Sequence, residues 1–238
     1  MANDKELIAY VQKAAGLTLT GDTTEHVFFF AYGPTRTGKS TLLNTLREML
    51  GDYGVHTPTE TLLAKQYDSG IPADLARLAG ARMVTAVEAN WNRQIDEARI
   101  KAMTGGEPIT ARFLRRNFFE FTPDFKLWFA ANDFPGVRGT AGAFWERVRA
   151  IPFEVEIPPE ERDRNLREKL KAEWPGILAW AVRGCRKWQA EGLGIPERVQ
   201  RTTGRWKQSA DHVRKFVNEE LTRDEGNALS SSDLYSHS

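Results

Sequence analysis

Hydrophobic residues follow two different patterns along the first 155 residues of this chain. Short, continuous apolar runs, which are typical of buried parallel strands, occur at residues 26–32, 82–88, 126–132 and 148–155. Apolar residues recur at helical spacing before and between these runs, at residues 4–15, 40–50 and 95–103. Alternating strands and helices predict an α/β fold with a mainly parallel sheet.

The pattern changes to helix beyond Pro158. Residues 163–174 and 175–192 are amphipathic, with Pro175 placed to start the second helix and Gly192 to end it. A charged segment with one more helix follows, and the final stretch, NALSSSDLYSHS, begins with a Ser/Asp signal for a helix start. The C-terminal part is therefore expected to add helices to the predicted sheet domain.

The composition limits the classes of protein to which this chain can belong. With 238 residues, 41% of them hydrophobic, it can bury one sizeable core and a small appendage. A formal net charge of +1 excludes a bulk polyelectrolyte, so any nucleic-acid contact must come from a local patch. The lone Cys185 is more ordinary as a small core residue than as a reactive thiol. It excludes internal disulfides and suits a reducing cytosol.

The chain shows no signal for export or for membrane insertion. Its first residues, MANDKELIAYVQKAAG, are typical of an amphipathic helix rather than of a leader. No apolar run approaches the ~20 residues of a membrane span. We therefore expect a soluble, cytoplasmic protein with no membrane partner.

The sequence GPTRTGKST follows the first predicted strand and precedes a helix. It contains the pattern G-x-x-x-x-G-K-[ST] in the context that a phosphate-binding loop requires, and the alternative is a chance match in a Gly/Thr turn. Backbone N–H groups of such a loop face phosphates, Lys39 is expected to reach the β- and γ-phosphates, and Ser40 to ligate Mg²⁺. We expect a nucleotide to bind at Gly33, Pro34, Thr35, Arg36, Thr37, Gly38, Lys39, Ser40 and Thr41.

The loop alone does not separate a helicase from a kinase, a GTPase or a packaging motor, because hydrolysis also needs groups that hold Mg²⁺ and orient water. Glu88 ends the second predicted strand, where the carboxyl edge of the sheet would place it beside the loop. Asn132 ends the third, where its amide can position water or contact the γ-phosphate. The alternatives are an ordinary exposed acid at Glu88, and an Asn132 that merely opens the turn before Pro135.

Two arginines, Arg147 and Arg149, stand close together in FWERVRAIPF, where the last predicted strand begins. We expect one of them to face solvent or a neighbouring subunit and the other to pack inward. An arginine that reaches the γ-phosphate of another subunit stabilises the charge of the transition state. Two surface or salt-bridged arginines are the alternative.

The stretch TARFLRRNFFEF, residues 110–121, combines clustered cations with aromatic rings. Cations for phosphates and rings for stacking are the ingredients of single-strand binding, and the alternative is a solvated hairpin whose rings face the core. We expect Arg112, Arg115 and Arg116 to contact DNA, and most of the phenylalanines, Phe113, Phe118, Phe119 and Phe121, to lie in the core.

The ordered set of motifs resembles the ATPase domain of superfamily 3 helicases, a branch of the AAA+ class. More narrowly, it is similar to the C-terminal helicase part of phage and plasmid primase–helicases. The matching segments are GPTRTGKST, RMVTAVE, KAMTGGEPITAR, FKLWFAANDFP, FWERVRAIPFEV and the helical tail LREKLKAEWPGILAWAVRGCRKWQAEGL. The resemblance is strong from about residue 5 to 195 and weaker beyond.

The resemblance implies roles for individual residues. Glu88 is similar to the acidic residue of the family's second motif, Asn132 to its polar sensor, and Arg147 to its arginine finger, with Arg149 as the second candidate. The family's extra motif, which leads into a hairpin facing a central channel, corresponds to Lys101, Thr104, Gly105, Gly106 and Arg112. The chain departs from the family at Thr37, where Asn is frequent, and at Glu146, where a further arginine is frequent.

The resemblance also implies an architecture. It predicts an AAA+ P-loop core with a mainly parallel five-stranded sheet, flanked by N-terminal and C-terminal helices. The expected parts are a helical segment at residues 1–24, the ATPase core at 25–157, helices packing on that core at 158–195, and a linker, a helix and a truncated start of a winged-helix segment at 196–238. No primase region precedes the core, so the chain resembles an excised fragment or a protein whose primase is separate.

The function implied is that of an ATP-dependent DNA helicase module in the replication of a phage, plasmid or other mobile element, in a bacterial or infected host cell. The expected cofactors are ATP and Mg²⁺. The expected partners are further copies of the chain in a ring, most often a hexamer, single-stranded and forked duplex DNA, and a primase domain or protein. The rivals are a DNA translocase or packaging or loading ATPase without unwinding activity, a small-molecule kinase, and a non-catalytic DNA-binding module.

Overall fold

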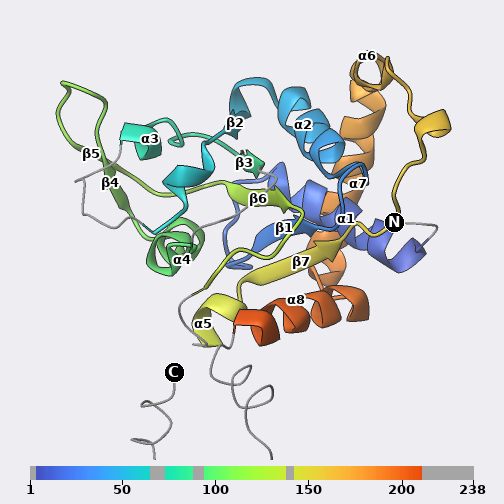
Figure 1. Ribbon diagram of the computed structural model, residues 1–238. Helices are drawn as coiled ribbons and strands as arrows, with labels where there is room; N and C mark the ends of the chain where they lie inside the picture. Colours follow the sequence, from blue (N-terminus) through green and yellow to red (C-terminus); the bar gives the residue numbers. More distant parts are fainter. Residues whose placement is uncertain (1–3, 65–72, 88–93, 138–141, 211–238) are drawn as a thin grey trace, which may run out of the picture.

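The computed structural model describes residues 4–64, 73–87, 94–137 and 142–210 (Figure 1). Five parallel strands form the central sheet, in the order β2-β3-β6-β1-β7. Their bounds are β1 Phe28–Tyr32, β2 Gly54–His56, β3 Met83–Val87, β6 Lys126–Ala131 and β7 Val148–Pro152. The predicted α/β fold, with its five-stranded parallel sheet and flanking helices, is therefore confirmed.

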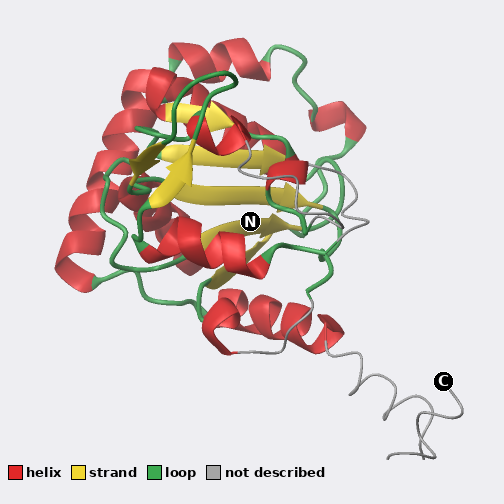
Figure 2. Ribbon diagram, turned by 90° about the vertical axis from the view of Figure 1, so that its left-hand side faces the viewer, coloured by secondary structure: helices red, strands yellow, loops and turns green. Residues whose placement is uncertain are grey.

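Helices surround this sheet, as Figure 2 shows from the side. They are α1 Lys5–Thr18, α2 Lys39–Met49, α3 Ala73–Ala76, α4 Glu97–Gly105, α5 Gly142–Trp145, α6 Leu166–Ala172, α7 Trp174–Glu191 and α8 Glu197–Ala210. Short 3-10 turns occur at Gly51–Tyr53, Thr59–Thr61 and Pro159–Glu161. A separate antiparallel hairpin joins β4 Ile109–Ala111 to β5 Phe119–Phe121.

The sheet is buried on both faces, which explains why its strands are continuous apolar runs. In β1, Phe28 and Phe30 belong to the core on one face, with Ile100 of α4 and Trp206 of α8. Phe29 and Ala31 belong to the core on the other face, whose residues come also from α1, α2 and α7. Side chains that alternate between two apolar layers favour apolar residues at successive positions of a strand.

The N-terminal helix packs on α7 at very short range. Gly16 of α1 and Gly184 of α7 lie at the crossing, where a Cβ atom on either glycine would overlap the backbone of the opposite helix. The edge strand β7 is covered by α8, where the hydroxyl of Thr203 accepts a hydrogen bond from the backbone N–H of Ala150 (3.1 Å). The domain boundaries given above stay predictions, and the stretch NALSSSDLYSHS lies outside the described residues. None of the helices in the described ranges combines the length and the apolar character that a membrane crossing needs.

Lys126, the first residue of β6, is an ionisable group inside the fold. Its side chain is 2% exposed, and its ammonium nitrogen has no hydrogen-bond partner among the described residues. The pKa of Lys126 is lowered from 10.5 to about 8, mainly by burial and in part by the neighbouring Arg82, while Asp22 and Asp124 oppose the shift. Burying a charge without a partner destabilises the folded state, so this lysine is expected to cost stability at neutral pH.

We expect Lys126→Met to raise the free energy of unfolding at pH 7 by about 2 kcal/mol, since a pKa shift is worth about 1.4 kcal/mol per unit and relaxation reduces the total. Between pH 8 and 10.5 the unfolded chain binds more protons at this site than the folded chain. The wild type therefore gains stability relative to the variant as the pH rises through this window. Urea unfolding at pH 7 and pH 10 measures both effects. A variant that is less stable at pH 7, or a difference that does not change with pH, would contradict the prediction.

Candidate active site

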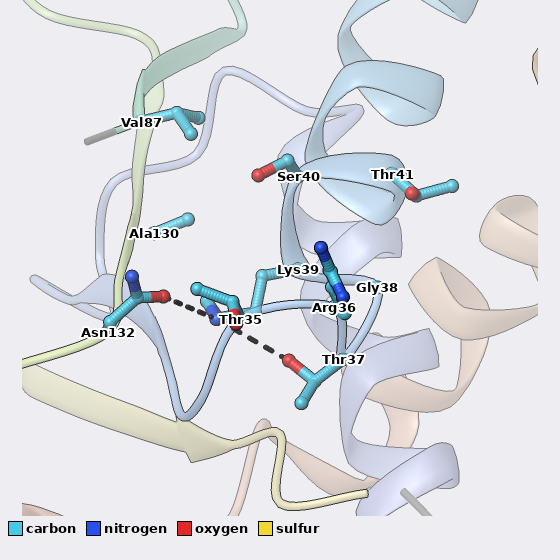
Figure 3. A pocket seen from close by; sticks show the side chains of 10 residues that line it. All are labelled: Thr35, Arg36, Thr37, Gly38, Lys39, Ser40, Thr41, Val87, Ala130 and Asn132. Carbon is cyan, nitrogen blue, oxygen red and sulfur yellow. Dashed lines mark hydrogen bonds between the residues drawn. The ribbon is translucent and has the colours of Figure 1, made fainter. Parts of the chain in front are cut away.

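The glycine-rich loop joins β1 to α2 at the carboxyl edge of the parallel sheet, where ligands bind in open α/β folds. A pocket of about 390 Å³ lies over this loop (Figure 3). It is lined by Thr35, Arg36, Thr37, Gly38, Lys39, Ser40, Thr41, Val87, Ala130 and Asn132. The structure thus brings most of the predicted nucleotide-binding residues together with the end of β6.

The backbone of this loop depends on its glycines. Gly38 has a φ of +88° and caps the start of α2, and open space surrounds the place where a Cβ would stand. Gly33 has a φ of +146°, and a Cβ there would overlap the carbonyl oxygen of Phe153. Arg36 also has a positive φ, of 62°. Such left-handed turns point successive backbone N–H groups towards one concavity, which is how loops of this kind bind anions.

Lys39 lies at the bottom of this pocket and is 6% exposed. Its ammonium group donates to the carbonyl oxygens of Gly33 (2.7 Å) and Pro34 (2.5 Å). It also donates to Thr37 Oγ1 (3.4 Å) and to Asn132 Oδ1 (3.1 Å), the contacts that are dashed in Figure 3. Burial lowers the pKa of Lys39. The ammonium therefore lies between the loop and β6, where oxygen atoms accept its hydrogen bonds. A phosphate oxygen could accept from the same group.

Asn132 follows β6 directly, and β6 is paired with β1 in the sheet. This neighbouring position explains why its amide reaches Lys39 although the two residues are far apart in the sequence. The hydroxyl of Ser40 lies at the same pocket, on the first turn of α2. Glu88 lies outside the described residues, but Val87 before it lines the pocket. Within the described ranges, no group of three or more His, Cys, Asp and Glu residues is placed to hold a metal ion.

An apolar hollow of about 520 Å³ adjoins the pocket over the glycine-rich loop and shares Gly38 and Thr41 with it. Its walls come from α2, from the segment after β7, and from α6 and α7. The apolar side chains that line it are Leu42, Leu46, Ile157, Leu166, Leu170, Ile177 and Trp180. The sequence pattern identified these helices as amphipathic but did not distinguish the residues that face this hollow from those that face the core.

The two arginines before and within β7 are both half-buried. Arg147 precedes the strand and donates from Nη1 to the carbonyl oxygen of Ala143 in α5 (2.7 Å). Arg149 lies in the strand and donates to the carbonyl oxygens of Glu146 (2.6 Å) and Val148 (3.0 Å). Burial lowers the pKa of Arg149, and the nearby Tyr10 and Glu25 oppose that shift. Arg149 therefore lies towards α1, whereas Arg147 lies beside α5.

Both arginines lie at the amino end of β7, and the glycine-rich loop lies at the carboxyl end of its neighbour β1. A strand rises about 3.3 Å per residue, so the five residues of β7 separate the two edges of the sheet by roughly 16 Å. Neither arginine lines the pocket over the glycine-rich loop of its own chain, and both donate to backbone carbonyl oxygens that precede β7.

The basic stretch forms the hairpin β4–β5 and its loop, which projects at the left of Figure 1, away from α2. Arg112, Arg115 and Arg116 are exposed, and the guanidinium of Arg112 lies over the ring of Phe118 at 4.9 Å. Lys101 is half-buried on α4, while Thr104 on the same helix is buried and donates to the carbonyl oxygen of Ile100 (2.7 Å). The predicted cationic cluster is thus accessible at one end of the molecule.

The expectation that most phenylalanines of this stretch lie in the core is wrong for Phe113 and Phe118, which are 47% and 56% exposed. Phe119 and Phe121 are half-buried against the core, because they belong to β5 itself. Phe113 and Phe118 belong to the loop between the strands, which extends beyond the sheet, and Leu114 beside them is 82% exposed. The tip of the hairpin is therefore both apolar and cationic.

Viral proteins named as helicases resemble this chain in sequence. It is 28% identical over 243 residues to "Putative helicase 022R" of Frog virus 3 (isolate Goorha), a match that covers 93% of this chain and 25% of that protein. It is 27% identical over 252 residues to a protein of Acanthamoeba polyphaga mimivirus that is also named a putative helicase, with 98% of this chain and 26% of the relative covered. The matches support a helicase-like family. The helicase-like chain spans about a quarter of the length of these relatives.

Two further comparisons concern the family model and the fold. The family described as "Family of unknown function (DUF5906)" matches residues 31–147 of the helicase-like chain. Its fold is similar to the apo structure of the NrS-1 C-terminal region, with a TM-score of 0.64 over 93% of this chain and 56% of that one. At 11% identity, this likeness shows a common fold alone.

Proposed function

We propose that this chain is the ATP-hydrolysing module of a superfamily 3 DNA helicase, active in the replication of a phage, plasmid or other mobile element. The observation that carries the proposal is the contact of Lys39 with Asn132 in a pocket over the glycine-rich loop. That pocket lies at the carboxyl edge of a parallel sheet, where phosphoryl-transfer enzymes of this class hold a nucleotide. The viral relatives named as helicases support the same conclusion.

Each residue of the pocket has a separate proposed role in phosphoryl transfer, which depends on positioning and on charge stabilisation. Lys39 binds the β- and γ-phosphate oxygens in exchange for its present carbonyl acceptors, and Asn132 orients the attacking water. Mg²⁺ neutralises charge on the phosphates when bound, and Ser40 and Glu88 are its proposed ligands. The backbone N–H groups from Gly33 to Thr41 hold the remaining phosphate oxygens.

The nucleoside has a place beside the phosphates in the apolar hollow between α2, α6 and α7. This hollow begins at Gly38 and Thr41, so a group bound there is continuous with phosphates bound on the loop. Pockets for aromatic ligands are lined mainly by apolar and aromatic side chains, as this one is by Ile177 and Trp180.

The proposed reaction is completed between subunits. Because Arg147 lies at the sheet edge opposite its own pocket, its guanidinium can serve the pocket of another copy. We therefore place Arg147 at the γ-phosphate of a neighbour, in a ring that is most often a hexamer in this class. Arg149 is the weaker candidate, since it faces Tyr10 and Glu25 inside its own chain.

The hairpin is the proposed contact with single-stranded DNA, supported by Lys101 on α4. Exposed arginines can pair with phosphates, and the exposed rings of Phe113 and Phe118 can stack on bases. A primase domain or protein is a further proposed partner.

Replacing Arg112, Arg115 and Arg116 together by alanine is expected to weaken binding to a single-stranded oligonucleotide. The dependence of log affinity on log salt concentration should fall by about 2, because each phosphate contact contributes roughly 0.7 for single strands. Fluorescence anisotropy over a salt series measures this slope. The matched control replaces three exposed cations of α6 and α7, Lys169, Lys171 and Arg183. An equal loss in both triple variants would contradict a DNA contact at the hairpin.

Unwinding of a forked duplex tests the proposed function. The protein, with ATP and Mg²⁺, is expected to release the displaced strand, and neither ADP nor a non-hydrolysable analogue should replace ATP. Hydrolysis stimulated by single-stranded DNA but without unwinding would instead indicate a translocase or a packaging or loading ATPase. Hydrolysis that ignores DNA and transfers phosphate to a metabolite would indicate a small-molecule kinase, and DNA binding without turnover a non-catalytic module.

A further inference from the structure

The loop that follows Asn132 is packed under the last described helix. Phe134, two residues beyond Asn132, stacks on Tyr32 with ring centroids 3.9 Å apart and an angle of 13° between the ring planes. Its ring is also parallel to that of Trp206 in α8, at 5.5 Å and 3°. The single ring of Phe134 is thereby in contact with two elements of the fold, β1 and α8.

Trp206 adds a second attachment to the same loop. It is completely buried, and its indole N–H donates to the carbonyl oxygen of Pro135 (3.0 Å). Its ring also packs on Phe30 of β1, at 4.6 Å. A buried indole that uses its one donor on this carbonyl fixes the height of residues 132–135 over the sheet.

Tyr32 connects the stack to the phosphate-binding loop, because it is the last residue of β1 and directly precedes Gly33. Its carbonyl oxygen accepts from the backbone N–H of Phe153 (2.7 Å), and the guanidinium of Arg205 in α8 lies over its ring at 5.9 Å. One helix therefore contacts both the residue before the glycine-rich loop and the segment after Asn132.

We infer that Phe134 and Trp206 are positioning residues, through which α8 holds the Asn132 amide at the distance that Lys39 and a bound phosphate require. The Asn132 Oδ1 atom is 3.1 Å from Lys39 Nζ, and backbone movement of less than 1 Å in the following residues would break this contact. Catalytic geometry tolerates such movement poorly. The inference rests on the proposed hydrolysis of ATP, but its structural part can be tested without any turnover.

The first test is Trp206→Phe, which keeps an aromatic ring and removes the hydrogen bond to Pro135. We expect kcat for ATP hydrolysis to fall by about 5-fold or more, the equivalent of one neutral hydrogen bond, with KM changed by less than about 2-fold. The matched control is Trp188→Phe. Trp188 is also a buried tryptophan that donates its indole N–H, to Glu25 (2.6 Å), but it lies on α7 away from the pocket. An equal fall of kcat in both variants would overturn the inference.

The second test asks whether the stacked aromatic ring of Phe134 is needed, or only its hydrophobic volume. Phe134→Leu is expected to lower kcat by about 10-fold, whereas Phe134→Tyr, which keeps the stacked ring, should stay within about 2-fold of the wild type. Equal loss in both variants, or no loss in either, would show that the stack does not position Asn132.

The third test does not depend on ATP hydrolysis. In the nucleotide-free protein, hydrogen exchange of the backbone amides in residues 132–137 should be faster in Trp206→Phe and Phe134→Leu than in the wild type or in Trp188→Phe. If the wild type hydrolyses no ATP but this pattern appears, the proposed function fails and the positioning by α8 stands. If the wild type hydrolyses ATP and the exchange of this segment is the same in all four proteins, the inference fails and the proposed function stands.

Discussion

Lys39→Ala is expected to abolish ATP turnover, with a loss of at least ~10³-fold in kcat, because a preorganised charge is removed from the place where charge develops on the γ-phosphate. The ammonium is buried, and in the structure it already bridges the glycine-rich loop and Asn132. Arg36 also lines the pocket, but Lys39 is the cation that donates to Asn132 at the end of β6. Steady-state hydrolysis with Mg²⁺-ATP measures the effect.

Lys13→Ala is the matched control for this substitution. Lys13 also uses its ammonium to donate to a backbone carbonyl, that of Gly192 (2.9 Å), but it joins α1 to the residue after α7 and lies outside the pocket. Both variants lose a hydrogen bond from an ammonium group to a backbone carbonyl, and only Lys39→Ala should lose activity. A thermal melt checks that both remain folded. Turnover by Lys39→Ala within about 10-fold of the wild type would contradict the assignment of this pocket as the phosphate site.

Arg147→Ala is expected to bind ATP like the wild type and to hydrolyse it about 10³-fold more slowly, because an arginine supplied to another subunit acts on the transition state rather than on the bound substrate. Arg147 lies at the amino end of β7, opposite the pocket of its own chain. Its loss should therefore leave ATP binding to that pocket unchanged and affect only hydrolysis in a neighbouring copy. Equilibrium binding of a fluorescent ATP analogue and steady-state hydrolysis, measured on the same preparation, test the two halves of the prediction.

Mixing provides the control for Arg147. A mixture of Arg147→Ala with Lys39→Ala should recover part of the lost activity, since some interfaces then pair an intact loop with an intact arginine. The exposed Arg183 on α7 offers a matched substitution, and a mixture of Arg183→Ala with Lys39→Ala should only dilute the wild-type rate. Absence of any recovery in the first mixture would argue against a site made by two subunits.

Much of the sheet could be predicted from the sequence, because a strand that is buried on both faces is a continuous apolar run. The run FFFAY and, after Lys126, the run LWFAA are continuously apolar or aromatic, and both belong to strands of the parallel sheet. β2 was not identified from this pattern. It comprises only Gly54, Val55 and His56, which lie at the edge of the sheet and are not fully buried. A three-residue edge strand carries too little apolar character to differ from a loop.

The pocket over the glycine-rich loop was also predictable, because the loop is contiguous in the sequence and its glycines are required by backbone geometry, while its occupation by a phosphate stays a prediction. The place of Asn132 near the loop followed from the rule that parallel strands end at one edge, but its hydrogen bond with Lys39 was not predicted. The contact between Phe134 and Trp206 was not predicted, because it joins segments far apart in the sequence and no local pattern indicates it. The exposure of Phe113 and Phe118 was missed for a related reason: a phenylalanine after a strand does not show whether the chain turns towards the core or away from it.

Cooperation between copies of the chain is the central part of the proposed mechanism, and one measurement tests it directly. ATP hydrolysis is recorded across a range of protein concentrations, with the oligomeric state followed by light scattering, in the presence and absence of single-stranded DNA. The account predicts that the rate per chain rises with the assembled fraction and increases again when DNA is added. A monomer that hydrolyses ATP at the full rate and does not respond to DNA would contradict it.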